Sequence, residues 1–225
     1  MAFQDLLITE IFHSLQGETS LSGVRFAFIR LTGCNLRCSY CDSTYAFKGG
    51  RKMSIDQILE TIRPYQVRHV LLTGGEPLLQ RNTEALAKRL IEAGYVVSIE
   101  THGEVSVEKF ARDCRIVMDI KTPSSRMNRG GYAKNLPFLK ASDEIKFVIA
   151  SEEDYAFARG LISKERLNEH CEVLLSPAVV AKAQPGSFPG ITERWLAEKI
   201  LEDRLPVRMQ IQLHKTIWGA DQKGV

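Results

Sequence analysis

Residues 69–100 read HVLLTGGEPLLQRNTEALAKRLIEAGYVVSIE, and this stretch decides the fold class. Residues 69–73 form an apolar run typical of a buried strand, and residues 81–93 carry a helical pattern that Gly94 ends. Residues 95–100 again have the composition of a strand. A strand, a helix and a second strand in this order predict two parallel strands joined by a right-handed crossover.

The same alternation extends in both directions along the chain. It predicts further strands at residues 25–31, 115–120, 144–149, 172–175 and 207–213, and helices at residues 55–62, 105–112, 152–162 and 192–201. We therefore expect an α/β fold of parallel strands with βα crossovers, in which helices bury the sheet. The units are too few for a complete eight-stranded barrel. Because no repeat or low-complexity linker interrupts the pattern, we expect one domain over residues 1–225.

Composition excludes several classes of partner. The 225 residues are 44% apolar and 25% charged, with a formal net charge of +3. This balance is too mild for a surface that follows nucleic-acid phosphates, and no apolar run approaches the length of a membrane span. The first residues lack the basic segment of a signal peptide, so we expect a cytoplasmic protein that binds neither nucleic acid nor membrane. Five cysteines, three of them close together, fit a metal or redox site better than disulfides.

The residues best suited to catalysis or ligand binding follow the predicted strands. They include Cys34, the Gly74-Gly75-Glu76 turn, Lys121, Ser176 and His214. In parallel α/β folds the carboxyl ends of the strands share one edge, where the active site forms. We therefore expect these residues to line one site.

Cys34, Cys38 and Cys41 form a C-x3-C-x2-C motif on the loop after the strand at residues 25–31. Three thiolates on one loop suit three corners of a 4Fe-4S cluster that leaves one iron open. The alternative is a structural zinc site, which needs a fourth ligand from a remote part of the chain. The spacing alone leaves both open.

The loop after the next strand reads Thr73-Gly74-Gly75-Glu76-Pro77. Two glycines let the backbone approach a ligand closely, Glu76 offers an acceptor for an ammonium group, and Pro77 stiffens the turn. Such a sequence is also common in plain strand-to-helix turns. Together with the cysteine motif, however, it is specific.

These two motifs resemble those of the radical S-adenosylmethionine (SAM) superfamily, in which an aromatic residue precedes the third cysteine, as Tyr40 does here. Within that superfamily the chain resembles the 7-carboxy-7-deazaguanine synthase family. The segments that carry this resemblance are residues 12–18, 28–31, 33–36, 41–43, 73–77, 99–101, 119–125, 144–146 and 212–215. The resemblance implies an incomplete, TIM-like barrel as the radical SAM core.

The resemblance also implies the reaction and its cofactors. The reaction is a carbon–nitrogen lyase step in queuosine and 7-deazapurine biosynthesis, in which 6-carboxy-5,6,7,8-tetrahydropterin contracts to 7-carboxy-7-deazaguanine with loss of ammonia. The cofactors are a 4Fe-4S cluster on Cys34, Cys38 and Cys41, SAM, and Mg²⁺ at Ser43, where the family pattern has Thr. The partners are the small pterin substrate, an electron donor such as a flavodoxin, and a second copy of the chain in a homodimer.

By the same correspondence, two sets of residues bind the small molecules. The SAM-binding residues are Tyr40, Cys41, Asp42, Gly74, Gly75, Glu76, Asp119, Ile120, Lys121, Ser176, Pro177, Ala178 and Val179. The substrate-binding residues are Leu15, Gln16, Gly17, Arg30 and Thr73. Asp119 and Ile120 depart from a Ser-Pro pair found in some family members.

Two other functions compete with this interpretation. A glycyl-radical activase is also a small radical SAM enzyme, but it needs a surface that docks a protein rather than a site for a carboxylated substrate. A zinc-stabilised binding module requires a fourth metal ligand.

Overall fold

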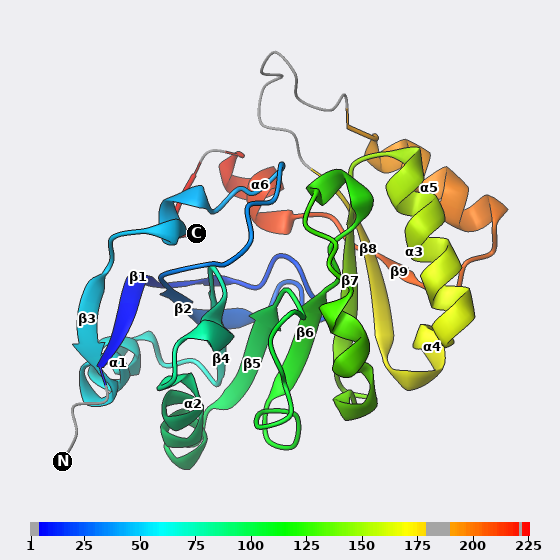
Figure 1. The fold of residues 1–225 in the computed structure, drawn as a ribbon. Helices are drawn as coiled ribbons and strands as arrows, with labels where there is room; N and C mark the ends of the chain where they lie inside the picture. The colour runs from blue at the N-terminus through cyan, green and yellow to red at the C-terminus, as the bar shows by residue number, and fades with distance from the viewer. Residues whose placement is uncertain (1–4, 179–189, 221) are drawn as a thin grey trace.

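A computed structural model describes residues 5–178, 190–220 and 222–225, which form one curved, nine-stranded sheet with helices packed on it (Figure 1). The strand order is β3-β1-β2-β4-β5-β6-β7-β8-β9. The strands are β1 (Asp5–Leu15), β2 (Arg25–Leu31), β3 (Arg51–Ser54), β4 (His69–Gly74), β5 (Val96–Thr101), β6 (Arg115–Asp119), β7 (Glu144–Ile149), β8 (Glu172–Pro177) and β9 (Arg208–Met209).

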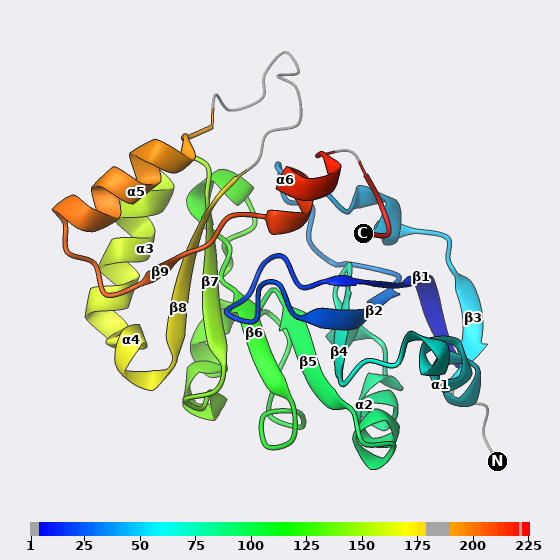
Figure 2. The ribbon, with the colours of Figure 1, turned by 180° about the vertical axis from the view of Figure 1, so that it is seen from behind.

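Six α-helices occur in the described residues, and short 3-10 turns link several of the strands. The helices are α1 (Ile55–Ile62), α2 (Thr83–Glu92), α3 (Glu152–Glu165), α4 (Leu167–His170), α5 (Glu193–Glu202) and α6 (Leu213–Trp218). Figures 1 and 2 show α1 to α5 on the outer side of the sheet, whereas α6 lies across one end of it. None of the helices in the described parts of the chain has the length and apolarity to cross a membrane.

In the order of the sheet, the neighbouring strands β2-β4-β5-β6-β7-β8-β9 all pair in parallel. This part of the sheet matches the predicted fold class. Residues Ile29, Leu72, Ile99 and Ile116, from four neighbouring strands, are fully buried. The helices cover them with apolar stripes, such as Ile55, Ile58 and Ile62 of α1. Because the sheet does not close, the incomplete barrel expected from the resemblance is confirmed.

Two strands were not anticipated from the sequence. β1 pairs antiparallel with β2 and β3, so the sheet has an antiparallel edge beside its parallel part. β1 is only partly buried along its second half, and its polar residues there disguise the alternation that marks a strand. This edge matters for function, because β1 leads directly into Gln16 and Gly17.

The helix predicted at residues 105–112 is wrong, because this segment forms a series of turns. Asn135, which is buried, donates to the carbonyl oxygens of Gly103 and Val105 and accepts a hydrogen bond from the Val107 amide. These bonds hold the start of the segment out of a helix, and the residues after it form isolated turns, such as the bonds from the Phe110 and Ala111 amides to the Val107 carbonyl.

The final strand predicted at residues 207–213 is much shorter than expected. Only Arg208 and Met209 pair with β8. Beyond them, Gln210 Nε2 and the Leu213 amide both donate to the Gly17 carbonyl oxygen, at 2.7 and 3.1 Å. The chain therefore turns across the end of the sheet and continues as α6.

Candidate active site

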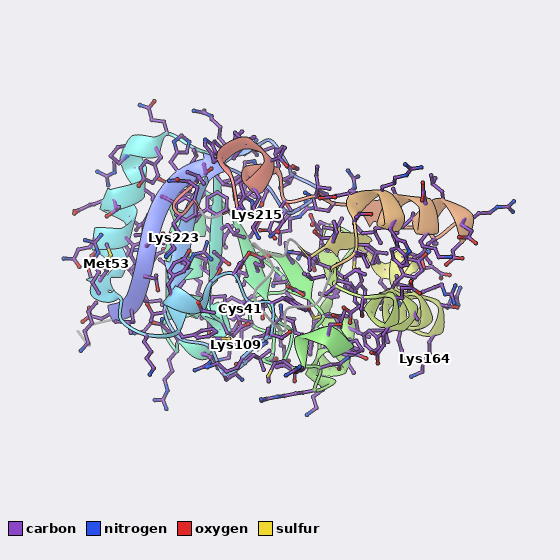
Figure 3. All side chains as sticks on the ribbon, turned by 90° about the horizontal axis from the view of Figure 1, so that it is seen from above. Cys41, Met53, Lys109, Lys164, Lys215 and Lys223 are labelled. Carbon is purple, nitrogen blue, oxygen red and sulfur yellow. The ribbon has the colours of Figure 1, made fainter. Side chains whose placement is uncertain are left out.

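A cavity of about 480 Å³ opens at the carboxyl ends of the parallel strands. Figure 3 views this end of the molecule from above and labels Cys41, Lys215 and Lys223, all of which line the cavity. The sequence-predicted residues that the structure brings to its wall are Leu15, Gln16, Gly17, Arg30, Cys34, Cys38, Tyr40, Cys41, Asp42, Ser43, Thr73, Gly74, Gly75, Asp119, Lys121 and Ala178.

Four predicted SAM-binding residues are not part of the cavity wall, and a fifth cannot be placed. Glu76, Ile120, Ser176 and Pro177 are buried in the protein and do not belong to the cavity wall. Val179 lies outside the described residues.

The cysteine loop has no regular secondary structure, and hydrogen bonds from neighbouring loops hold it. Ser39 Oγ donates to the Ser124 carbonyl at 2.6 Å, and the Ser39 amide donates to the Ser125 carbonyl at 3.1 Å. At the start of the loop, the Glu76 amide donates to the Gly33 carbonyl at 2.8 Å. The three thiols are therefore presented on a loop that is fixed at its start and between Cys38 and Cys41.

The three thiols are half-buried, and burial raises the pKa of each of them, that of Cys38 to about 11. The nearby Lys121 ammonium acts in the opposite direction. Iron binding must therefore displace the thiol protons. Within residues 5–178, 190–220 and 222–225, no three His, Cys, Asp or Glu side chains converge to hold a single metal ion. Three thiols spread around one cavity fit an iron–sulfur cluster, in which separate irons take one thiolate each.

The glycine turn after β4 packs directly against the cysteine loop. A Cβ atom at Gly75 would overlap the Gly33 carbonyl oxygen and lie 2.9 Å from Cys34 Cβ. A Cβ atom at Gly74 would overlap the backbone of Leu31. Both glycines are thus required by the close approach of two backbones.

Glu76 is completely buried, and its carboxylate connects the ends of β4 and β5. It accepts hydrogen bonds from Thr101 Oγ1, from the His102 amide and from the Leu78 amide, at 2.9 to 3.0 Å. Burial raises the pKa of Glu76 to about 7. In this arrangement the side chain fixes the glycine turn from behind.

His102 links this buried group to the cysteine loop. Its Nδ1 accepts from the Glu104 amide at 3.1 Å, so Nε2 carries the proton and donates to Asn35 Oδ1 at 2.8 Å. Burial, helped by the charge of Lys121, lowers the pKa of His102 to about 4. The neutral imidazole of His102 therefore holds Asn35, the residue that follows Cys34.

Lys121 and Asp119 form a buried ion pair at the wall, with Lys121 Nζ 2.7 Å from Asp119 Oδ2. Although burial acts against it, the Asp119 carboxylate raises the pKa of Lys121. The second carboxylate oxygen, Asp119 Oδ1, is buried and has no hydrogen-bond partner among the described residues. An acceptor of this kind suits a hydroxyl or ammonium group of a ligand.

Arg30 is held in position by the Glu10 carboxylate and by two aromatic rings. Its Nε donates to Glu10 Oε1 at 2.7 Å, and Tyr45 donates to the same oxygen at 2.8 Å. The guanidinium carbon also lies 6.0 and 5.9 Å from the ring centres of Phe12 and Tyr45. The ion pair leaves the two terminal nitrogens of Arg30 for a ligand carboxylate, to which a guanidinium can donate two parallel hydrogen bonds.

Gln16 and Thr73 complete this side of the cavity. Gln16 is 2% exposed, and its Nε2 has no acceptor within the described part of the chain. Thr73 Oγ1 donates to Glu100 Oε2 at 3.1 Å. Ser43, at the mouth, donates from its hydroxyl to Asp42 Oδ1 at 2.9 Å.

The wall also contains residues to which the sequence assigned no role, chiefly Glu18, Lys146, Tyr45 and Lys223, whereas Glu100 and His214 were expected there only as residues that follow predicted strands. A signal for one of them existed, since Lys146 interrupts an otherwise apolar predicted strand and a buried lysine needs a partner. The residues beyond Lys215 carried no such signal, because the C-terminal segment reaches the cavity only through the turn at Gly17.

The comparisons with known proteins agree with this geometry. Residues 28–145 match the model of the radical SAM superfamily, so the chain belongs to that class of enzymes. Curated relatives extend over almost the whole chain. A 7-carboxy-7-deazaguanine synthase from Koribacter versatilis is 43% identical over 224 residues, which cover 97% of this chain and 99% of the relative. One from Chlorobaculum tepidum is 40% identical over 223 residues, covering 98% and 97%.

The chain therefore belongs to the 7-carboxy-7-deazaguanine synthase family. A crystal structure of QueE from Escherichia coli has the same fold, with a TM-score of 0.72 at 22% sequence identity, over 94% of this chain and 97% of that one. Family membership favours the lyase over both the glycyl-radical activase and the zinc-stabilised module.

Replacing Gly75 with Ala is expected to displace the cysteine loop, because the new Cβ atom has no space against Gly33. Iron bound after anaerobic reconstitution should fall several-fold. The matched control is Gly160→Ala in α3, where a Cβ atom meets open space. If Gly75→Ala and Gly160→Ala bind iron equally well, the contact does not position the loop.

His102 is expected to make the metal-free protein sensitive to acid. The unfolded chain binds a proton at His102 near pH 6.5, whereas the folded chain resists it to about pH 4. Stability from this group is therefore present above pH 6.5 and is lost as the pH falls towards 4, by about 3 kcal/mol.

The measurement is urea unfolding of wild type, His102→Gln and the exposed-site control His170→Gln between pH 7 and 4. His102→Gln should lose less stability on acidification than the other two. The contribution of Glu76 has the opposite sign and is common to all three proteins. Parallel curves for His102→Gln and wild type would contradict the assignment.

Proposed function

We propose that this chain converts 6-carboxy-5,6,7,8-tetrahydropterin to 7-carboxy-7-deazaguanine with loss of ammonia, in a radical SAM reaction that depends on Mg²⁺. The observation that carries the proposal is one cavity lined both by the three cysteines and by Arg30. The cysteines lie on the loop that follows β2, and Arg30, which Glu10 holds in position, lies on β2 itself. Family membership supplies the reaction class.

Cys34, Cys38 and Cys41 hold a 4Fe-4S cluster in this proposal. When bound, the cluster supplies the electron that cleaves SAM and so begins the radical chemistry. The chain's own contribution is to fix the reacting groups relative to one another, since misplacement by about 1 Å can reduce a rate by on the order of 100-fold.

SAM binds beside the cluster, along the wall made by Tyr40, Asp42, Gly75, Lys121 and Ala178. The glycine turn lets the methionyl part approach the backbone, and the Lys121 ammonium offers a carboxylate partner. The free oxygen of Asp119 accepts a hydrogen bond from the bound molecule. Glu76 acts from behind the turn rather than as a direct ligand.

The substrate occupies the side of the cavity formed by Leu15, Gln16, Gly17, Arg30 and Thr73. Arg30 takes the substrate carboxylate, and the unpartnered Gln16 amide donates to a ring oxygen or nitrogen. Mg²⁺ binds at the Ser43 hydroxyl with substrate oxygens and water, the kind of ligand set that this ion prefers. The adjacent Asp42 carboxylate accepts the Ser43 hydroxyl hydrogen bond with one oxygen and pairs with Lys215 through the other, at 2.9 Å.

The remaining parts of the proposal concern the electron donor, the oligomeric state and the cellular location. A flavodoxin-type electron donor reduces the cluster, the enzyme works as a homodimer, and it works in the cytoplasm. The mild net charge of +3 and the three cysteines that line one cavity support a soluble enzyme in a reducing compartment.

Replacing Cys38 with Ala should remove one corner of the cluster and abolish reductive cleavage of SAM, while the fold is largely retained. On the same sample, iron content checks the loss of the cluster, far-ultraviolet circular dichroism checks the fold, and an assay of SAM cleavage checks the loss of activity. Cys171→Ala is the matched control, because Cys171 is buried beside β8 and away from the cavity wall. Unimpaired SAM cleavage by Cys38→Ala would remove the basis of the proposal.

Replacing Arg30 with Ala should spare substrate-independent SAM cleavage but weaken binding of the carboxylated pterin by about tenfold to a hundredfold, the value of a charge-assisted hydrogen bond. Arg30→Lys keeps a cation beside Glu10 but loses the two-pronged geometry, and should weaken binding less. Arg25→Ala, at the exposed start of the same strand, is the control. Unchanged affinity in both Arg30 variants would show that Arg30 is structural.

A further inference from the structure

Lys146 is a charged residue in the interior of the sheet. It lies in the middle of β7, is 3% exposed, and has a side chain at the cavity wall. Taking an ammonium group out of water costs several kcal/mol unless opposite charges and hydrogen bonds compensate. The chain must therefore supply such partners.

Two carboxylates from distant parts of the chain do so. Lys146 Nζ lies 2.5 Å from Glu18 Oε2, after β1, and 3.2 Å from Glu100 Oε1, on β5. The other oxygens are also occupied, since Glu18 Oε1 accepts from Gln212 Nε2 at 3.0 Å and Glu100 Oε2 accepts from Thr73 Oγ1. Asp119 contributes a more distant negative charge, although Lys121 pairs with it.

The Lys146 ammonium keeps the Glu18 carboxylate ionised. Burial alone would raise the pKa of Glu18, but Lys146 outweighs it and lowers the pKa to about 2, with a smaller contribution from His214 against the charge of Asp42. The pKa of Lys146 is raised well above its usual value by Glu18 and Glu100. Glu18 and Lys146 are therefore both charged at neutral pH.

One ammonium between two carboxylates leaves the group Glu18–Lys146–Glu100 with a formal charge of −1. Each ionised carboxylate accepts up to about four hydrogen bonds, so acceptor capacity remains on both. Glu18 and Glu100 are each partly exposed and line the cavity. This side of the cavity is thus a fixed acceptor surface that favours N–H donors.

Arg30 stands at the other end of the same row of residues. Arg30 of β2 is in register with Thr73 of β4, which in turn hydrogen-bonds Glu100 of β5. Strands lie about 4.8 Å apart, so the backbones at Arg30 and Glu100 are separated by about 10 Å. A ring system with a carboxylate at one end and N–H groups at the other matches this separation of charge.

We propose that Lys146 is a positioning residue that holds Glu18 and Glu100 as paired acceptors for the N–H groups of the substrate's ring, opposite the carboxylate site at Arg30. This inference rests on the proposed function, because it takes the same substrate. Lys146 itself donates to the two carboxylates, and it acts on the ligand through them.

The test compares dissociation constants of two ligands for the cluster-loaded protein with SAM present. One ligand is 6-carboxy-5,6,7,8-tetrahydropterin, and the other is its analogue without the 2-amino group. Wild type should favour the amino compound by about tenfold or more, the value of a hydrogen bond to a charged group. In Lys146→Met this preference should largely disappear, while SAM affinity and iron content remain unchanged.

Two further variants separate positioning from a structural role. Lys140→Met removes a different lysine, paired with buried Asp143 away from the cavity, and should keep the full preference. Glu100→Gln retains the Lys146–Glu18 pair and should lose the preference even if Lys146→Met fails to fold.

An equal loss of affinity for both ligands in Lys146→Met, or an unchanged preference in Glu100→Gln, would overturn the inference. Wild-type protein that binds neither ligand would instead contradict the proposed function, so the two failures are distinguishable.

Discussion

The glycine turn after β4 and the first residue of the cysteine loop meet with no space for a side chain between them, and the rest of the site depends on this contact. Gly75 lies against the Gly33 carbonyl, and the amide of Glu76 donates to the same oxygen. A loop without regular structure cannot hold three thiols in place by itself. Parallel strands provide the solution, because they bring the loops after β2, β4 and β5 to one edge, where each supports the next.

That support continues behind the cavity through polar side chains. Glu76 connects the turn to Thr101 and His102, and His102 connects it to Asn35 beside the first cysteine. Glu76, Thr101 and His102 are buried and hydrogen-bonded within the protein, whereas Asn35 is exposed. A network of this kind is rigid because any change leaves a buried polar group unpaired. The chemistry at the cavity therefore relies on residues that do not touch a ligand.

The sequence predicted the parallel part of the fold well, because β2, β4, β5, β6, β7 and β8 are short apolar runs separated by helical patterns or turn signals. It predicted which loops carry the site for the same reason. It did not predict the turns at residues 105–112, since Asn135 holds the start of this segment from a distance. The antiparallel edge, the path of the C-terminal segment over Gly17, and the pairing of Lys146 with Glu18 and Glu100 depend likewise on contacts between residues far apart in the chain. Periodicity and motif spacing contain no information on such contacts.

The central claim is that this cavity carries out a ring contraction of a carboxylated pterin. The most direct measurement is an anaerobic turnover assay on cluster-reconstituted protein with 6-carboxy-5,6,7,8-tetrahydropterin, SAM and a reductant, with and without Mg²⁺, in which mass spectrometry identifies the product. We expect 7-carboxy-7-deazaguanine and ammonia in equal amounts, with more product when Mg²⁺ is present. Cleavage of SAM with the pterin left unchanged under both conditions would contradict it.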